Sequence, residues 1–469
     1  MIYSYLIISL VCIFIILLLN NKKLTHAVVY LFGFFQIYFC YELYTHPERC
    51  QNEYFSVDSI GVLFTIILAV LSLVAAVHYQ KYETLHKEDI RSVKIHNAVY
   101  IGFNAALVGV YLSGHYGLLW AFIEATTLTG ATLIYHDRKK IVLEAVWKYV
   151  FACSVSITLA FTGILLLSVA AQEIKLSELS FELLAQNAQI MNPVWLKAAF
   201  IFILVGFSVK MGVSPMFNVD IDAKDVSPFP IGALFSSVLL NAGFLAIYRF
   251  YSIFKDTEMG VWMNHVLVIA SVLTLLFASA HLLKAKNYKR LFAYSSMEHS
   301  GLVLIAITLG KLGILAAFLH LTFHAVVKSG LFFQIGQVIR LNQGKKEAIT
   351  GYFYQNPLGG FILLFGSLAI MALPPSGLFI SELLIFKSLL LQQNGLIIIL
   401  IFSLLSIIFY ALLTSVFKLL FYPSTTEKVI VKPKTYWLEN LLQLFLLGLS
   451  VYFGLFQSQF LIDLIQASL

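Results

Sequence analysis

The segment WLKAAFIFILVGFSVKMGVSPMFNVDIDAKDVSPFPIGALFSSVLLNAGFLAIYR, from Trp195 to Arg249, decides how the rest of the chain folds. Two long apolar stretches flank a short polar loop, the pattern of consecutive membrane-spanning helices. Lys210 lies inside the first stretch, and Gly212 and Pro215 follow it. Such residues interrupt a helix and free backbone carbonyl groups. Because a charge at membrane depth is costly, a lysine beside a helix break predicts an ion or proton pathway.

The composition predicts an all-α membrane protein with little soluble mass. The 469 residues are 60% hydrophobic and 12% charged, whereas a soluble domain carries about 25% charge. The first apolar segment, 2–19, is longer than the core of a signal peptide and is predicted to be the first span. The four scattered cysteines predict neither a metal site nor a disulfide framework. The net charge of +7 is attributed to basic loops, with no nucleic-acid partner.

The apolar segments predict about fourteen transmembrane helices, since a span needs roughly 20 apolar residues. They are expected near residues 2–20, 24–45, 57–79, 96–114, 116–135, 141–171, 195–216, 229–250, 261–283, 291–310, 312–339, 357–392, 396–422 and 435–456. Pro215 breaks the seventh. Pro374 and Pro375 break the twelfth, so a count of fifteen stays open.

The loop charges predict the orientation of the chain in the membrane. Most basic loop residues fall in alternate loops, beginning with the first. They are Lys22, Lys23, Lys81, Lys87, Arg91, Lys94, Arg138, Lys139, Lys140, Lys224, Lys284, Lys286, Lys289, Arg290, Arg340, Lys345, Lys346, Lys428, Lys432 and Lys434. Because basic loops stay on the cytoplasmic side, both termini are expected on the outer face of a bacterial cytoplasmic membrane.

Two short matches suggest an internal repeat. The sixth predicted helix carries Glu144 and Lys148, and the eleventh carries His324 and Lys328, each with the pattern A-x-x-K after a titratable residue. The two helices are five apart and therefore cross in opposite directions. The helix breaks in the seventh and twelfth are also five apart, a feature of inverted-repeat transporters.

The repeat predicts four segments. Residues 1–95 would form an N-terminal three-helix segment, 96–250 a first five-helix proton-channel repeat, 261–422 a second and inverted repeat, and 435–469 a C-terminal helix.

Glu124 is the first of the intramembrane carboxyl groups, in the middle of LLWAFIEATTLTGATLIY. Acidic groups at this depth are rare and commonly functional. A pair between Glu124 and Lys210 or Lys148 would hold both groups charged, while desolvation pushes both toward neutrality, so opening the pair would release or take up a proton. The alternative is a structural, protonated carboxyl bonded to a neighbouring threonine or to the backbone.

A second titratable set lies on one face of the eleventh helix, because His320, His324 and Lys328 recur at intervals of four. Neutral imidazole accepts and donates hydrogen bonds at once, so a proton wire is the favoured interpretation. Haem or metal ligation and a purely structural role are the alternatives. Glu382, after the Pro374–Pro375 break, is predicted to be an outlet carboxyl, and Asp58 is predicted to be a helix cap.

These stretches resemble the antiporter-like proton-pumping subunits of respiratory complex I, Mrp-type antiporters and membrane-bound hydrogenases, above all the hydrogenase-4 component F branch. The resemblance is carried by WAFIEATTLTGATLIY (120–135), GFSVKMGVSPMF (206–217), KRLFAYSSMEHSG (289–301), FLHLTFHAVVKSGLFF (318–333) and LPPSGLFISELL (373–384).

The resemblance implies a fourteen-helix core with two inverted five-helix bundles and broken seventh and twelfth helices. The family's helix-five glutamate falls on Glu124, its helix-seven lysine on Lys210, its helix-eleven histidine and lysine on His324 and Lys328, and its helix-twelve outlet group on Glu382. The sequence departs from the family pattern at Asn241, where many members have lysine, and at Phe217, where a histidine is usual.

Three functions follow as hypotheses. The first is a proton-translocating, non-catalytic membrane subunit of a larger redox-driven complex, without its own cofactor and with partner subunits supplying the chemistry. The second is a subunit that lends proton-motive force to inorganic-carbon uptake, or a Na⁺/H⁺ antiporter subunit. The third is a haem-binding membrane anchor. The ion, H⁺ or Na⁺, is not decided by the sequence.

Overall fold

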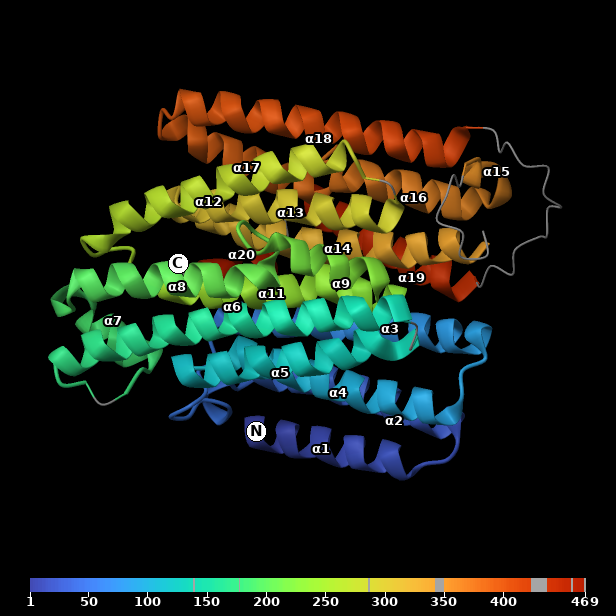
Figure 1. Cartoon of the computed structure of the whole chain (residues 1–469), viewed down its shortest axis with the longest axis horizontal. Coiled ribbons are helices and arrows are strands. Elements are labelled where there is room, and N and C mark those ends of the chain that lie inside the picture. Colours follow the sequence, from blue (N-terminus) through green and yellow to red (C-terminus); the bar gives the residue numbers. More distant parts are fainter. Residues whose placement is uncertain are drawn as a thin grey trace. The chain divides into compact units, whose positions relative to one another are not determined.

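The computed structural model is helical along its length (Figure 1). It describes residues 1–137, 140–176, 178–285, 287–341, 350–422, 437–456 and 459–467. Within these ranges, extended pairing is limited to two isolated bridges, Phe55 with Ser113 and His115 with Ser180. Several residues of the predicted basic loops lie outside the described ranges: Arg138, Lys139, Lys286, Lys345, Lys346, Lys428, Lys432 and Lys434.

The helices begin and end close to the predicted bounds. They are α1 (Ile2–Leu18), α2 (Lys22–Thr45), α3 (Ser59–His86), α4 (Ile90–Leu112), α5 (Tyr116–Ile134), α6 (Lys140–Glu173), α7 (Phe181–Asn187), α8 (Pro193–Met211), α9 (Phe217–Val226), α10 (Phe229–Leu234), α11 (Leu240–Phe254), α12 (Met259–Leu282), α13 (Tyr288–Ile307), α14 (Gly310–Leu341), α15 (Tyr352–Gln355), α16 (Pro357–Ile370), α17 (Gly377–Leu391), α18 (Gly395–Phe421), α19 (Trp437–Leu455) and α20 (Gln459–Gln466).

The helical fold predicted from hydropathy is confirmed. Eleven helices among the described residues are long and apolar enough to cross a membrane, and α1 and α16 are shorter apolar helices. Each of the fourteen predicted segments contains at least one helix. The seventh, 195–216, holds α8, which ends at Met211, and α9 begins beyond the predicted bound. The twelfth is divided into α16 and α17. The helix breaks near Pro215 and at Pro374–Pro375 are therefore confirmed. The Ser214–Pro215 and Pro374–Pro375 peptide bonds are cis.

The eighth predicted segment is continuous but irregular. Its two α-helical parts, α10 and α11, are joined by a π-helical stretch, Phe235–Leu239. Such local widening of a helix is frequent at functional sites. Here it directly precedes Asn241.

The chain forms two compact units. Unit 1 holds residues 1–231 and 238–270, and unit 2 holds 232–237 and 271–467. The boundary near residue 270 lies inside α12. The finer division into four segments and the inverted relation of the two repeats stay predictions.

Polar side chains join the ends of two neighbouring helices in unit 1. The Asp58 carboxylate accepts a hydrogen bond from the backbone N–H of Gly61 at 2.8 Å, so Asp58 caps the beginning of α3, as predicted. The guanidinium of Arg249 reaches the same carboxylate at 3.2 Å and donates to the Tyr111 carbonyl at 2.8 Å. One arginine from α11 therefore joins the beginning of α3 to the end of α4.

Small residues allow close contact between the helices around the first break. A Cβ atom on Gly206 of α8 would lie 2.5 Å from the backbone nitrogen of Ala160 in α6. A Cβ atom on Gly243 of α11 would lie 2.8 Å from the Cβ of Lys210. Helices α6 and α11 therefore pack closely against α8, the helix that ends beside the break.

We predict that Gly206→Val destabilises unit 1 by about 1–3 kcal/mol, because the added side chain must push α6 away from α8. The matched control is Gly448→Val in α19, where a Cβ atom would meet nothing within 4 Å. Thermal unfolding of the purified protein in detergent measures both. Equal apparent Tm values for the two variants would contradict this packing.

Candidate functional site

The first buried lysine lies where α8 ends. Gly212 has a φ of +71°, a left-handed conformation that glycine adopts readily, and its N–H bonds to the Ser208 carbonyl at 2.9 Å. This cap ends the helix two residues after Lys210. The Lys210 side chain is 2% exposed, and its Nζ donates to the Tyr149 hydroxyl of α6 at 3.1 Å. The last turn of a helix favours a cation, because the helix dipole is negative there.

Two carboxyl groups influence Lys210 electrostatically. They are Glu124 of α5, which is half-buried, and Asp220 of α9, which is 5% exposed. Among the described residues, the hydrogen bond of Lys210 goes to Tyr149 and Lys148 pairs with Glu144, so neither predicted ion pair with Glu124 is present in this structure. One oxygen of Glu124, Oε2, is buried and bonds to no group in the described chain.

Asp220 also forms an ion pair with Lys224, one helical turn further along α9. Both side chains are buried, whereas the sequence analysis assigned Lys224 to a basic loop; that assignment is wrong. A Cβ atom at Gly212 would lie 2.8 Å from Oδ2 of Asp220, so this carboxylate packs directly against the helix break. Asp220 is therefore the one carboxylate near Lys210 that also has a second lysine.

Asn241 lies in α11, two residues before the glycine that packs on Lys210. Its side chain is fully buried, and neither amide atom forms a hydrogen bond with the described residues. Buried polar groups are nearly always satisfied, by protein or by water, so such a group calls for an explanation. Asn241 presents a neutral group that can both donate and accept a hydrogen bond.

Glu144 and Lys148 are placed differently from the other candidates. They form an ion pair at 2.6 Å on α6, and each side chain is 66% exposed. The structure therefore does not bring this pair into the buried set around Lys210. Its role as a relay stays a prediction.

Unit 2 also holds a fully buried lysine that is a predicted relay residue. Lys328 of α14 is fully buried, and its Nζ donates to the Phe292 carbonyl at 3.0 Å and to the Ser295 hydroxyl. Both acceptors belong to α13. Glu298 lies one turn beyond Ser295 on α13 and is 6% exposed. It is within electrostatic range of Lys328 and Glu382.

A hydrogen-bonded row of side chains crosses unit 2 from α13 through α14 to α17. Nδ1 of His299 lies 2.9 Å from Nε2 of His320, and Nδ1 of His320 lies 3.0 Å from the Ser381 hydroxyl. Ser381 donates to the Leu378 carbonyl at 2.9 Å. With the serine proton placed there, each imidazole is consistent with one N–H donor and one acceptor. The ring of His324 lies 4.8 Å from that of His299.

Glu382 lies beside this row. His299, His320 and Glu382 each offer a ligand atom, and these atoms lie within 4.8 Å of one another. Their donor types suit a metal such as zinc. However, the direct bond between the two histidines already uses one nitrogen of each, so the arrangement suits proton exchange among imidazole, hydroxyl and carboxyl groups.

Sequence analysis missed several of these residues. Tyr149 and Asp220 were not proposed at all, Ser381 was not considered, and Glu298 and His299 were not assigned a role. Glu298 and His299 could have been identified from the sequence, because two adjacent titratable residues stand out in a largely apolar helix. For Tyr149 no sequence signal could give the partner, because Lys210 lies on another helix. For Asp220 the spacing of four to Lys224 was a signal that could have indicated their ion pair.

Comparison with known proteins identifies the family. A family model described as NADH:quinone oxidoreductase/Mrp antiporter, transmembrane, matches residues 113–409. The chain belongs to this family. The resemblance inferred from the sequence motifs is thereby confirmed, and every predicted relay residue, from Glu124 to Glu382, lies within the matched range.

Relatives of this antiporter family match along most of the chain. The Hydrogenase-4 component F homolog of Methylacidiphilum infernorum (isolate V4) is 32% identical over 351 residues, 72% of this chain and 73% of that protein. NADH-quinone oxidoreductase subunit N of Chlorobium chlorochromatii (strain CaD3) is 27% identical over 446 residues, 90% of this chain and 84% of that protein.

A solved structure shares the fold. A chain of the membrane-bound sulfane sulfur reductase, an archaeal respiratory membrane complex, matches with a TM-score of 0.86 at 21% identity, covering 100% of this chain and 96% of that chain. The shared fold therefore includes the helices on either side of the range matched by the family model.

We predict that Asp220→Asn destabilises the protein by about 3–5 kcal/mol, because it leaves Lys224 buried without an anionic partner. Adding Lys224→Met to this variant should restore most of the lost stability, since no buried charge then remains unpaired. Thermal unfolding of the two single variants and the double variant forms the test. A double variant no more stable than Asp220→Asn would show that the pair is not the source of the effect.

Proposed function

We propose that this protein translocates protons across the membrane, as a subunit that carries no redox centre of its own. The observation that carries the proposal is the hydrogen-bonded row His299–His320–Ser381, which lies beside Glu382 in the interior of unit 2. A row of groups that both donate and accept can pass a proton by successive exchange. Membership of the antiporter family supports this function.

Each unit would hold one loading site built on a buried lysine. In unit 1, Lys210 shares its environment with Tyr149, Glu124 and Asp220. An approaching carboxylate favours the charged lysine, and desolvation favours the neutral one, so movement of charge near the break changes the proton affinity of Lys210. In unit 2, Lys328 would be the loading site, within electrostatic range of Glu298, and the histidine row would carry the proton onward to Glu382.

Asp220 would be the moving element in unit 1. It lies on α9, the short helix after the break. It forms an ion pair with Lys224 and interacts electrostatically, without contact, with Lys210. A small shift of α9 would transfer the carboxylate from one lysine to the other. Glu144 and Lys148 would then act only at the surface of α6.

The driving reaction would belong to partner subunits. The relatives named above are components of a hydrogenase and of a quinone oxidoreductase, and the solved neighbour is part of a respiratory complex. By the same reasoning the protein would reside in a bacterial cytoplasmic membrane, with both termini on the outer face as the basic loops predict.

We predict that Lys210→Met lowers proton flux at least about tenfold, equivalent to raising the barrier by about 1.4 kcal/mol. Methionine keeps the length of the side chain but cannot bind a proton. Proteoliposomes containing the co-purified complex, with a pH-sensitive dye inside, give the flux. Lys418→Met, at the exposed end of α18, is the matched control and should leave it unchanged. Normal flux in Lys210→Met would rule out this lysine as a relay.

We predict that His320→Phe blocks the flux to a similar extent, because phenylalanine fills the space without linking His299 to Ser381. His265→Phe in α12 is a control that replaces a histidine outside the row.

The same preparations separate two alternatives. Flux that requires Na⁺ would indicate a sodium-coupled antiporter, and a Soret absorbance band lost in His320→Phe would indicate haem binding.

A further inference from the structure

A set of buried polar side chains lies in unit 1 on α2, α3 and α4, outside the range matched by the family model. Three of them, His96, Tyr100 and Asn104, recur at intervals of four along α4 and so share one face of that helix. Each is no more than 4% exposed. Apolar side chains would pack this region at less cost, so the polar ones need a reason.

The set begins at a cluster of charged groups where α3 ends and α4 begins. Glu83 accepts a hydrogen bond from Lys22 at 2.6 Å, and its second oxygen lies 3.6 Å from Nε2 of His26. The neighbouring Glu88 contacts His136, which follows α5. Each of these two carboxylates therefore has a histidine partner that can hold a proton.

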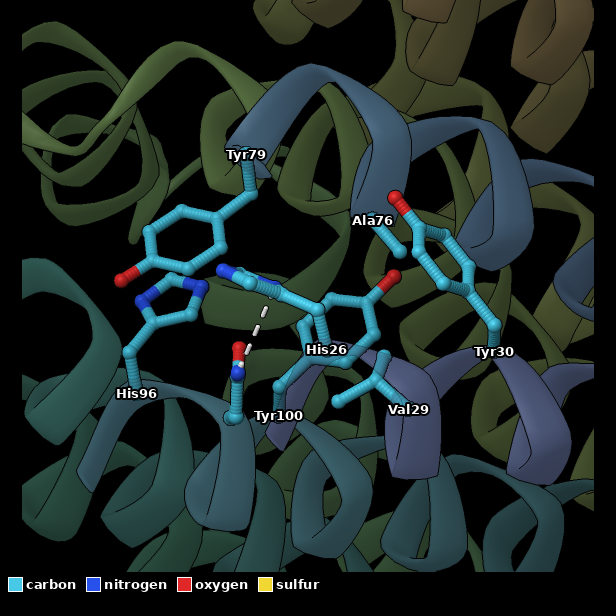
Figure 2. A pocket seen from close by; sticks show the side chains of 8 residues that line it. His26, Val29, Tyr30, Ala76, Tyr79, His96 and Tyr100 are labelled. Atoms are coloured by element: carbon cyan, nitrogen blue, oxygen red, sulfur yellow. Dashed lines mark hydrogen bonds between the residues drawn. The ribbon is translucent and has the colours of Figure 1, made fainter. Parts of the chain in front are cut away.

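Behind the charged cluster lies a narrow crevice (Figure 2). The rings of His96 and Tyr79 stack face to face, with centroids 3.4 Å apart, and His26 projects toward them. The His96 ring also lies 4.8 Å from that of His136. The lining side chains are His26, Val29, Tyr30, Ala76, Tyr79, His96, Asn97 and Tyr100.

Polar groups continue from the crevice toward the middle of the helices. The Tyr100 hydroxyl donates to the Ser72 carbonyl, and the Ser72 hydroxyl lies 3.5 Å from Oε1 of Gln36. Asn104 donates to the Tyr100 carbonyl at 2.8 Å. From Ser72 to Glu83 the set spans eleven residue-to-residue steps of α3, or about 16 Å at 1.5 Å per residue. That is about half of the hydrocarbon thickness of a bilayer.

Four polar atoms along this path have no hydrogen-bond partner in the described chain: both ring nitrogens of His96, Nε2 of Gln36 and Oδ1 of Asn104. All are deeply buried. Buried polar atoms of native proteins that lack a protein partner are commonly satisfied by water. Their succession from the crevice to the middle of α4 marks a path that water molecules can complete.

We propose that α2, α3 and α4 enclose a third proton path, a gated half-channel that leads from Glu83 and Glu88 to Gln36 and Asn104 and takes up water when its gate opens. Its ligands are water and the excess proton. The stacked rings of His96 and Tyr79 form its gate, because the crevice as packed has no room for a water molecule until these rings separate. The path lies outside both lysine sites and would add proton access to the N-terminal three helices.

The first test measures water access and needs no transport activity, so its outcome is independent of the proposed function on which the proton's role rests. Asn104→Cys is introduced into a chain whose cysteines, Cys12, Cys40, Cys50 and Cys153, are replaced by alanine. A hydrophilic, charged methanethiosulfonate is added to membranes from the face that bears loop 87–89. Adding His96→Ala, which opens the gate, should speed labelling of Asn104→Cys at least about tenfold.

The matched control is Ala106→Cys, buried at the same depth but on the other side of α4. It should label slowly whether or not His96→Ala is present. Equal labelling rates for the two cysteines, with and without His96→Ala, in variants that elute as monodisperse protein, would overturn the half-channel.

The second test asks whether the path carries protons. In proteoliposomes of the full complex, His96→Phe should slow proton uptake at least about fivefold, because the larger apolar ring keeps the gate closed and binds no proton. His281→Phe, which replaces a histidine at the end of α12, should have no effect. Rapid labelling of Asn104→Cys together with normal uptake in His96→Phe would reveal a hydrated crevice without proton transport and would overturn the proposal.

Discussion

The structure depends on burying ionisable groups in the apolar membrane interior while giving each of them a hydrogen-bond or electrostatic partner. Lys210 shows the solution. It sits in the last turn of α8, where the helix dipole favours a cation, and its ammonium group donates to Tyr149. The helix must end there, and Gly212 ends it with a left-handed residue. A helix continued past Lys210 would lose both the dipole and the space that Asp220 occupies.

Lys328 is also fully buried, but its hydrogen-bond partners are of a different kind. Lys328 lies within an unbroken helix, and its partners are a carbonyl and a hydroxyl of α13 rather than a helix terminus. Lys210 donates to no carboxylate in the described chain, and carboxyl groups act on it from a distance. This arrangement keeps the proton affinity of Lys210 sensitive to small movements of charge, which a direct buried ion pair would suppress.

Much of the fold could be predicted from the sequence, because each span must be apolar over about 20 residues and each break carries proline. Lys210, Lys328 and Glu382 were found because a charged residue stands out in an apolar segment. Their partners were harder to predict. The spacing of four places His320, His324 and Lys328 on one face of α14, but which side chain of α13 or α17 meets that face depends on packing between helices, so His299 and Ser381 were missed. The exposure of Glu144 and Lys148 was missed for the same reason.

The most direct measurement of proton loading at Lys210 is nitrogen-15 solid-state NMR of the lysine side chains in the membrane-embedded complex, with Lys210→Met assigning the resonance. The relay mechanism predicts that Lys210 changes between ammonium and neutral amine when the complex is energised. A resonance that stays that of a fully charged ammonium group, at rest and during turnover, would contradict it.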